Sequence, residues 1–302
     1  MTRAYLAPDS LDDALAAMAA GARPIAGGTD LVVGARHGKA PLPESLCAIH
    51  RVRELAGIVS DGMGGIVLGA LASHASIVAH PEIRARFSGL ADASAIVGSH
   101  ATRHTGTIGG NVMNGSPAMD TGASLICAGA VATLASSAGT RNVAVADLLI
   151  GPGRTSAAAG ELLTSLRLPG PQAGTGSSYI RLEYRRQMEI AIVGVGCQLT
   201  RASDGSVSDV RIAITALAPT IHRIPEAEAL LEGSDGADEA IRAAGEAVAA
   251  GSRPISDVRG SDRYRRAMAA VIARRAIAAA LTRAAGGSVP IPASQAPGAV
   301  EA

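Results

Sequence analysis

The stretch PIAGGTDL (residues 24–31), taken together with TGTIGGN (residues 105–111), decides how this chain is interpreted. Each stretch contains a Gly-Gly pair after an apolar approach, and each carries small polar side chains, namely Thr29, Thr107 and Asn111. Paired glycines are typical of positions where φ is positive or where another group approaches the main chain closely. Consecutive amide N–H groups without obstructing Cβ atoms can bind an anion. The two stretches therefore predict two loops that hold one pyrophosphate between them.

A carboxylate, Asp120, lies ten positions after Gly110 in the segment SPAMDTGASLICAG. Ser116 as a cap and Pro117 at the first helical position predict a helix with Asp120 near its positive end. A carboxylate accepts hydrogen bonds from sugar-alcohol hydroxyls and repels phosphate, so Asp120 suits a ribityl chain. The alternative is a carboxylate that is only settled at a helix N-terminus.

Length and composition indicate a folded protein with more than one core. The chain has 302 residues, so two or three subdomains are expected. Hydrophobic residues make up 48% and charged residues 18%, which is ordinary for a globular protein. The formal charge of +1 provides no global field that would attract nucleic acid or an anionic membrane, so no nucleic-acid partner is expected.

The cysteines and the N-terminal segment indicate a reducing compartment. Cys47, Cys127 and Cys197 are an odd number without metal-ligand spacing, so we expect neither a disulfide framework nor a metal site in this chain. Charged residues come too early for a secretory signal, and no stretch approaches the ~20 apolar residues of a membrane span. These observations predict a cytoplasmic protein without a membrane span.

Two other signatures are excluded. The run GVGCQL (residues 194–199) lacks the third glycine of the dinucleotide fingerprint and lies within a strand pattern. His100 and His104 are four positions apart, but their flanks are loop-like and no glutamate follows His100. The chain therefore offers no sign of a Rossmann site or of a zinc protease helix.

Periodicity and turn residues predict the order of the elements. The first half alternates short strands and helices, and PGPQAGTGSS (residues 169–178) is the best candidate linker. Antiparallel strands with a turn at Asp204 and Gly205 follow the linker, and the remainder is helical. Helices are predicted over residues 10–21, 225–231, 235–250 and 261–285, with helical patches over 73–97, and strands around 22–26, 45–50, 65–70, 130–145, 161–169 and 178–217.

Six motifs resemble one known family in their order and spacing. They are PIAGGTDL, TGTIGGNVMNGSPAMD, GELLTSLRLP, EIAIVGVG, IAITALAPT and DRYRRAMAAVIARRAI. Together they are similar to the FAD-binding medium subunit of molybdenum hydroxylases, a family that includes the medium subunit of aerobic carbon monoxide dehydrogenase and resembles the flavin domain of xanthine dehydrogenase. The resemblance runs from about Tyr5 to about Ala285, which is nearly the whole chain.

The resemblance implies an α+β fold in which a two-part FAD-binding domain of the vanillyl-alcohol oxidase (PCMH) type precedes an α+β C-terminal domain with an antiparallel sheet and helices. The expected divisions are residues 1–57 for FAD-binding subdomain 1, 58–175 for subdomain 2, 176–287 for a C-terminal domain of the CO dehydrogenase flavoprotein type, and 288–302 for a flexible tail that is disordered or docked.

The resemblance also implies which residues contact FAD. Asp120 would bind the ribityl hydroxyls, Leu163 would lie near the adenine through its main chain, and Ile190 would pack close to the isoalloxazine ring. Arg181 stands where relatives often have lysine; arginine keeps the charge but changes the hydrogen-bond geometry. The pyrophosphate would be held by Pro24, Ile25, Ala26, Gly27, Gly28, Thr29, Asp30 and Leu31, and by Thr107, Ile108, Gly109, Gly110 and Asn111.

The implied function is that of an oxidoreductase subunit. Such a chain takes electrons from an iron-sulfur subunit and passes them to an external acceptor such as NAD, a quinone or dioxygen. The molybdopterin cofactor, two 2Fe-2S clusters and the choice of substrate lie on partners, a large molybdopterin subunit and a small iron-sulfur subunit, in what is expected to be a dimer of heterotrimers. The flavin carries the redox chemistry, so no catalytic acid, base or nucleophile is named. The alternatives are a stand-alone FAD-dependent oxidase or reductase of the same fold, and a non-catalytic assembly subunit.

Overall fold

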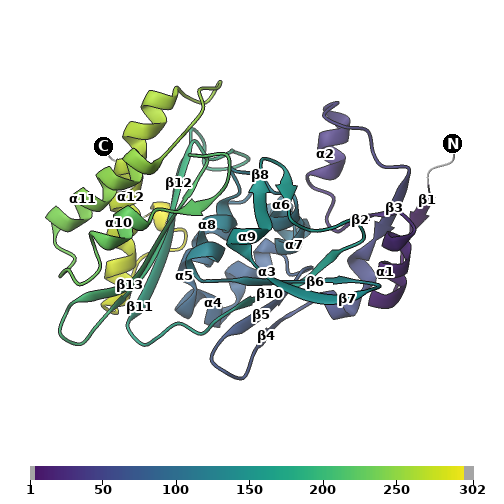
Figure 1. Cartoon of the computed structure of the whole chain (residues 1–302), viewed down its shortest axis with the longest axis horizontal. Coiled ribbons are helices and arrows are strands. Elements are labelled where there is room, and N and C mark those ends of the chain that lie inside the picture. Colours follow the sequence, from purple (N-terminus) through teal and green to yellow (C-terminus); the bar gives the residue numbers. More distant parts are fainter. Residues whose placement is uncertain (1–3, 296–302) are drawn as a thin grey trace.

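The computed structural model describes residues 4–295 and arranges them in three units along the longest axis of the molecule (Figure 1). The N-terminal unit lies at one end, a second unit with most of the short helices lies in the middle, and the C-terminal unit lies at the other end. The predicted class, α+β with an antiparallel C-terminal sheet, is confirmed.

The N-terminal unit is built on a small parallel sheet. Its strand order is β1 (Ala4–Leu6), β3 (Ser45–Ala48), β2 (Arg23–Ile25). The predicted first helix is present as α1 (Leu11–Ala19), and the side chain of Ser10 accepts the Asp13 N–H as its cap. The core of this unit includes Ala135 and Leu162 from the second unit, so the two units share one apolar cluster. The remaining elements are α2 (Leu31–Arg36), η1 (Ile49–Arg51) and η2 (Arg53–Leu55).

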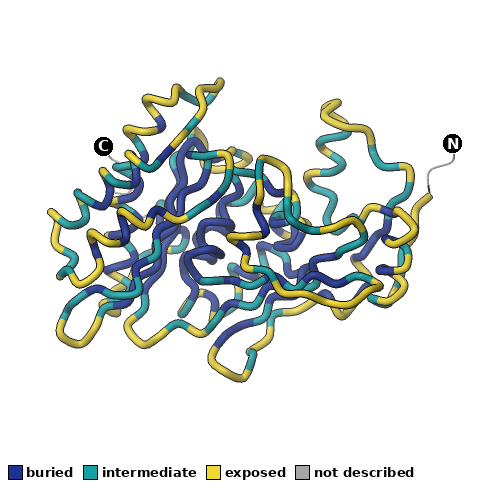
Figure 2. Tube along the Cα trace, in the orientation of Figure 1, coloured by how far each residue is buried: buried dark blue, intermediate teal, exposed yellow. Residues whose placement is uncertain are grey.

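The second unit is a five-stranded antiparallel sheet with helices packed on it. The strand order is β4 (Ile58–Ser60), β5 (Ile66–Gly69), β10 (Leu162–Leu168), β6 (Val131–Ser136), β7 (Gly139–Ala144). The buried aliphatic side chains of these strands and helices form the largest apolar cluster among the described residues. In Figure 2 much of the trace in the middle of the molecule has the colour of buried residues. The other elements are α3 (His74–Ala79), α4 (Pro81–Arg86), α5 (Ser88–Ala95), α6 (His100–Thr105), α7 (Ile108–Met113), α8 (Asp120–Cys127), α9 (Val145–Leu148), β8 (Leu149–Gly151) and β9 (Arg154–Thr155).

The C-terminal unit pairs an antiparallel sheet with helices. The strand order is β11 (Thr175–Leu182), β12 (Val193–Arg201), β13 (Val207–Thr215), β14 (His222–Arg223). The predicted C-terminal helices are α10 (Pro225–Ala229), α11 (Asp238–Gly251) and α12 (Asp262–Ala284), and Ser261 caps the last of them. Among the described helices, none combines the length and the apolarity needed to cross a bilayer.

Glycines of β12 let the second unit approach the C-terminal sheet closely. A Cβ atom on Gly194 would lie 2.2 Å from the hydroxyl oxygen of Tyr179, and one on Gly196 would lie 3.1 Å from Ala123 of α8. The thiol of Cys127, at the end of α8, donates to the carbonyl of Gly196 at 3.5 Å. The run GVG is therefore a packing surface for α8 and Tyr179.

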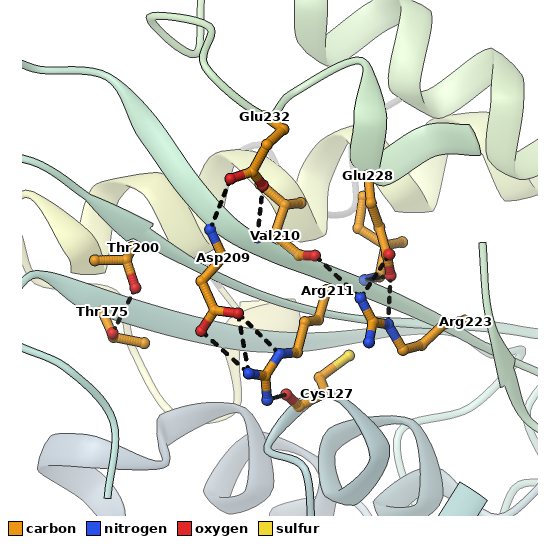
Figure 3. A network of polar contacts seen from close by, with 10 residues as sticks. Cys127, Thr175, Thr200, Asp209, Val210, Arg211, Arg223, Glu228 and Glu232 are labelled. Carbon is orange, nitrogen blue, oxygen red and sulfur yellow. Dashed lines mark hydrogen bonds and ion pairs between the residues drawn. The ribbon is translucent and has the colours of Figure 1, made fainter. Parts of the chain in front are cut away.

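A polar network along β13 joins the sheet to its neighbours (Figure 3). The Glu232 carboxylate accepts the backbone N–H groups of Asp209 and Val210, each at 3.1 Å. These two donors of β13 are therefore satisfied by a side chain that follows α10. Arg211 pairs with Asp209 and also donates to the carbonyl of Cys127 at 3.1 Å. Since an arginine at a helix C-terminus complements the helix dipole, this contact ties the end of α8 to the C-terminal sheet.

Two local predictions differ from the structure. The helix expected from Pro117 begins at Asp120, because Ser116 accepts the Ala118 N–H in a separate turn. Residues 175–178, expected in a linker, belong to β11. Residues 288–295, expected in a tail that is disordered or docked, are docked: Ala293 is fully buried and donates its N–H to the Asp92 carboxylate at 2.9 Å, while residues 296–302 lie outside the described residues.

Gly194→Ala is expected to lower the free energy of unfolding by about 1–3 kcal/mol, because the new methyl group would overlap the buried Tyr179 hydroxyl. The midpoint of urea denaturation measures this change. Gly34→Ala, in α2, is the matched control because nothing lies within 4 Å of its new methyl group. Equal midpoints for both variants would contradict the packing role of Gly194.

Candidate functional site

The first glycine stretch is an irregular bend between β2 and α2. A Cβ atom on Gly27 would lie 1.9 Å from the carbonyl oxygen of Thr105, so only glycine fits this position. Gly28 has φ of +67°, a conformation that disfavours other residues, and a Cβ atom there would lie 3.2 Å from the Ile25 side chain. The two glycines thus serve different needs, close approach at one position and left-handed backbone at the next.

The same bend presents unpaired donors. Among the described residues, the N–H groups of Gly27, Gly28, Thr29 and Asp30 have no hydrogen-bond acceptor. They lie in a part of the chain that is at least partly exposed, so an incoming group can reach them. A run of free amide donors fits the oxygens of a diphosphate.

The second glycine stretch differs from the prediction of an open loop. Thr107 caps α7, and the Gly-Gly pair lies in the first turn of that helix. The N–H groups of Ile108 and Gly109 already donate to carbonyls of Ala72 and Ala70, each at 2.9 Å. Gly110 is exposed, and its N–H donates to the Thr107 hydroxyl at 3.1 Å. Within residues 107–111 the exposed position is therefore Gly110.

The two glycine stretches lie side by side. The contact between Gly27 and the Thr105 carbonyl joins the first bend to the first residue of the second stretch. The hydroxyl oxygen of Thr29 also lies 3.5 Å from the position of a Cβ atom on Gly106. The Thr29 side chain and the free amides are thereby placed next to the start of α7, where one ligand can reach both.

Asp120 lies deep beside this region and is bound by the C-terminal unit. One carboxylate oxygen accepts from the Tyr179 hydroxyl at 2.8 Å, and the other accepts from Arg181 at 2.7 Å. Burial raises the pKa of Asp120 to about 6, although Arg181 and Tyr179 act in the opposite direction. Both oxygens have protein partners, so the structure favours a structural carboxylate at the start of α8 over the predicted ribityl contact.

Leu163 and Ile190, predicted to lie near the adenine and the isoalloxazine ring, differ in their exposure. Leu163 is buried in β10, and the carbonyl of the next residue, Thr164, accepts from Ala70, whose own carbonyl accepts from Gly109. Leu163 is thus connected to the second glycine stretch through backbone hydrogen bonds. Ile190 is 47% exposed in the loop between β11 and β12, near Arg181.

One buried residue at the site was not predicted from sequence. His74 is 1% exposed beneath the second stretch, with its ring 3.4 Å from the Cβ position of Gly106, and its Nδ1 has no acceptor or donor among the described residues. Burial, together with the nearby cation of Arg103, lowers the pKa of His74 to about 4. No local pattern marks it, because its neighbours arrive from α6, far along the chain.

Comparison with known proteins identifies the family. Residues 1–171 match the model for the FAD binding domain in molybdopterin dehydrogenase, and residues 178–280 match that for the CO dehydrogenase flavoprotein C-terminal domain. The chain belongs to the FAD-binding medium subunits of molybdenum hydroxylases.

Relatives of this family span the chain almost completely. The carbon monoxide dehydrogenase medium chain of Hydrogenophaga pseudoflava is 33% identical over 93% of this chain and 98% of its own length. The nicotine 6-hydroxylase medium subunit of Paenarthrobacter nicotinovorans is 33% identical over 71% of this chain and 75% of its own length. A solved structure of the Hydrogenophaga carbon monoxide dehydrogenase superposes with a TM-score of 0.89 at 34% identity, covering 94% of this chain and 98% of that chain.

We expect the stability of this medium subunit to fall in acid partly through His74. The pKa of His74 is 6.5 in the unfolded chain and about 4 in the folded chain. As the pH falls through this range, the unfolded chain binds a proton that the folded chain does not, so the free energy of unfolding decreases by on the order of 3 kcal/mol. Urea unfolding of the wild type and of His74→Gln at a series of pH values measures the difference. If the difference between the two proteins stays constant from pH 7 to pH 4, His74 does not titrate as the structure implies.

Proposed function

We propose that this medium subunit binds FAD between its two glycine stretches and carries electrons from an iron-sulfur partner to an external acceptor. The observation that carries the proposal is the run of unpaired amide donors at Gly27–Asp30, placed directly beside the start of α7. The residues fit a diphosphate because four consecutive N–H donors lie in a partly exposed bend, in which Thr29 adds a hydroxyl.

The roles of the site residues follow from their places. Residues 24–31 supply the principal N–H donors to the diphosphate. Residues 107–111 supply the exposed surface at Gly110, in the first turn of α7. Leu163 is assigned to the adenine side and Ile190 to the isoalloxazine side. Asp120 and Arg181 form an ion pair in which each charge neutralises the other, so we assign both residues to the wall of the site. The domain divisions at residues 57, 175 and 287 are part of this proposal.

FAD, when bound, would supply the redox chemistry, since it can collect two electrons that arrive singly and then deliver them to the acceptor. The chain binds and orients the cofactor, and its apolar and peptide groups exclude water from it. The proposed partners are a small iron-sulfur subunit and a large molybdopterin subunit in a dimer of heterotrimers in the cytoplasm. The relatives support this arrangement because they are themselves medium chains or subunits of larger enzymes.

The chain is expected to take up FAD when expressed alone, and Gly110→Val is expected to weaken that uptake by about tenfold or more, equivalent to about 1.4 kcal/mol. Valine fits the α7 backbone, and the nearest atom to its Cβ is the Thr107 hydroxyl oxygen at 3.1 Å, so its branches would cover the outward face of Gly110. Titration of flavin fluorescence measures the affinity.

Gly151→Val is the control, because nothing lies within 4 Å of its new Cβ atom and Gly151 belongs to neither glycine stretch. A folded chain that gains no flavin spectrum in excess FAD would contradict the proposal. Turnover of a small substrate by the isolated chain would instead support a stand-alone oxidase or reductase.

A further inference from the structure

Arg181 is a buried cation that connects three segments of the chain. Its side chain is 0% exposed. One terminal nitrogen donates to Asp120 at 2.7 Å and to the carbonyl of Glu189 at 3.4 Å. The other donates to the carbonyl of Ile96 at 3.2 Å and to the carboxylate of Glu183. Two nitrogens of one guanidinium therefore serve four acceptors.

Two of these acceptors belong to the loop of residues 183–192, which joins β11 to β12. Glu183 lies at the beginning of the loop and Glu189 lies near its end. Arg181 thus holds the loop at both ends from inside the protein. Its other two acceptors, Asp120 and the Ile96 carbonyl, belong to the second unit, so the loop is fixed relative to that unit.

The tip of the loop also contacts the second unit. The N–H of Met188 donates to the carbonyl of Gly98 at 3.0 Å, and the Thr102 hydroxyl donates to the Met188 sulfur at 3.7 Å. Met188 has φ of +53°, which a methionine adopts only where its surroundings impose it. Ile190, two positions on, is exposed beside these contacts. The loop therefore has one imposed shape.

We propose that Arg181 is a positioning residue that fixes the 183–192 loop, and with it Ile190, against the flavin site. The inference rests on the proposed function, in which Ile190 faces the isoalloxazine ring. Asp120 is the anchor on the side of the second unit, and the Tyr179 hydroxyl holds its other oxygen. Arg181 acts through the loop and needs no contact with the cofactor.

The geometry of arginine matters here. Lysine would keep the positive charge beside Asp120, but its donors radiate from a single nitrogen at the end of a flexible stem. It could not reach the loop acceptors and the acceptors of the second unit in the fork that the guanidinium spans. Arg181→Lys is therefore the variant that separates charge from positioning.

Limited trypsin digestion tests the anchoring without any cofactor, because the loop contains the exposed arginines Arg185 and Arg186. Cleavage after these residues is expected to be about tenfold faster in Arg181→Lys, since proteolysis follows the population of the open loop. Mass spectrometry of the fragments measures the rate at this site. Arg211→Lys is the matched control, because Arg211 also joins a carboxylate to a backbone carbonyl of the second unit.

Added FAD gives the second readout. FAD is expected to protect the loop of the wild type more than that of Arg181→Lys, and the visible absorption spectrum of flavin bound to the variant should shift toward that of free FAD because water reaches the ring. If Arg181→Lys does not fold, the double variant Asp120→Asn, Arg181→Gln removes both buried charges together and should show the same rapid cleavage. Loop cleavage as slow as in the wild type, in folded Arg181→Lys or in the folded double variant, would overturn the inference, whereas failure of the wild type to bind FAD would contradict the proposed function instead.

Discussion

A contact between two backbones, at Gly27 and the carbonyl of Thr105, determines whether this site can exist. Any side chain at position 27 would overlap the Thr105 carbonyl at the end of α6. It would push the bend between β2 and α2 away from the second glycine stretch. The shared apolar cluster reinforces the same contact, because Ala135 and Leu162 of the second unit pack in the core of the N-terminal one. Backbone contact and apolar packing therefore place the free amide donors beside the start of α7. This placement does not require an ion pair.

Elements with local signals could be predicted from the sequence, and elements set by distant contacts could not. The capping serines Ser10 and Ser261 mark α1 and α12, because each side chain bonds a nearby N–H. Gly109 and Gly110 were interpreted as a loop, yet Thr107 caps a helix there. The reason for glycine at 109 is Ala70, whose Cβ lies 2.7 Å from the Cβ position of Gly109, a contact that no local pattern reveals.

The family resemblance assigns Asp120 to the FAD site but does not reveal its neighbours. Its partners in the structure, Tyr179 and Arg181, lie about sixty positions later in the chain. A carboxylate taken out of water needs a partner of its own, and here the protein supplies two. The sequence left two roles open for this residue, and long-range packing favours the structural one.

Tyr179 shows why the C-terminal unit belongs to the site. Its hydroxyl donates to Asp120 and its backbone N–H donates to Asp92, a fully buried carboxylate that also pairs with Arg283. Apolar packing alone would tolerate small shifts between the units. Moving Asp120 or Asp92 away from its partners, however, would leave an uncompensated charge in an interior of low polarity. The ion pairs therefore select one orientation of the C-terminal sheet. Because that sheet carries the loop with Ile190, the same orientation would fix one wall of the site that we propose for FAD, which would make the C-terminal domain a component of that site.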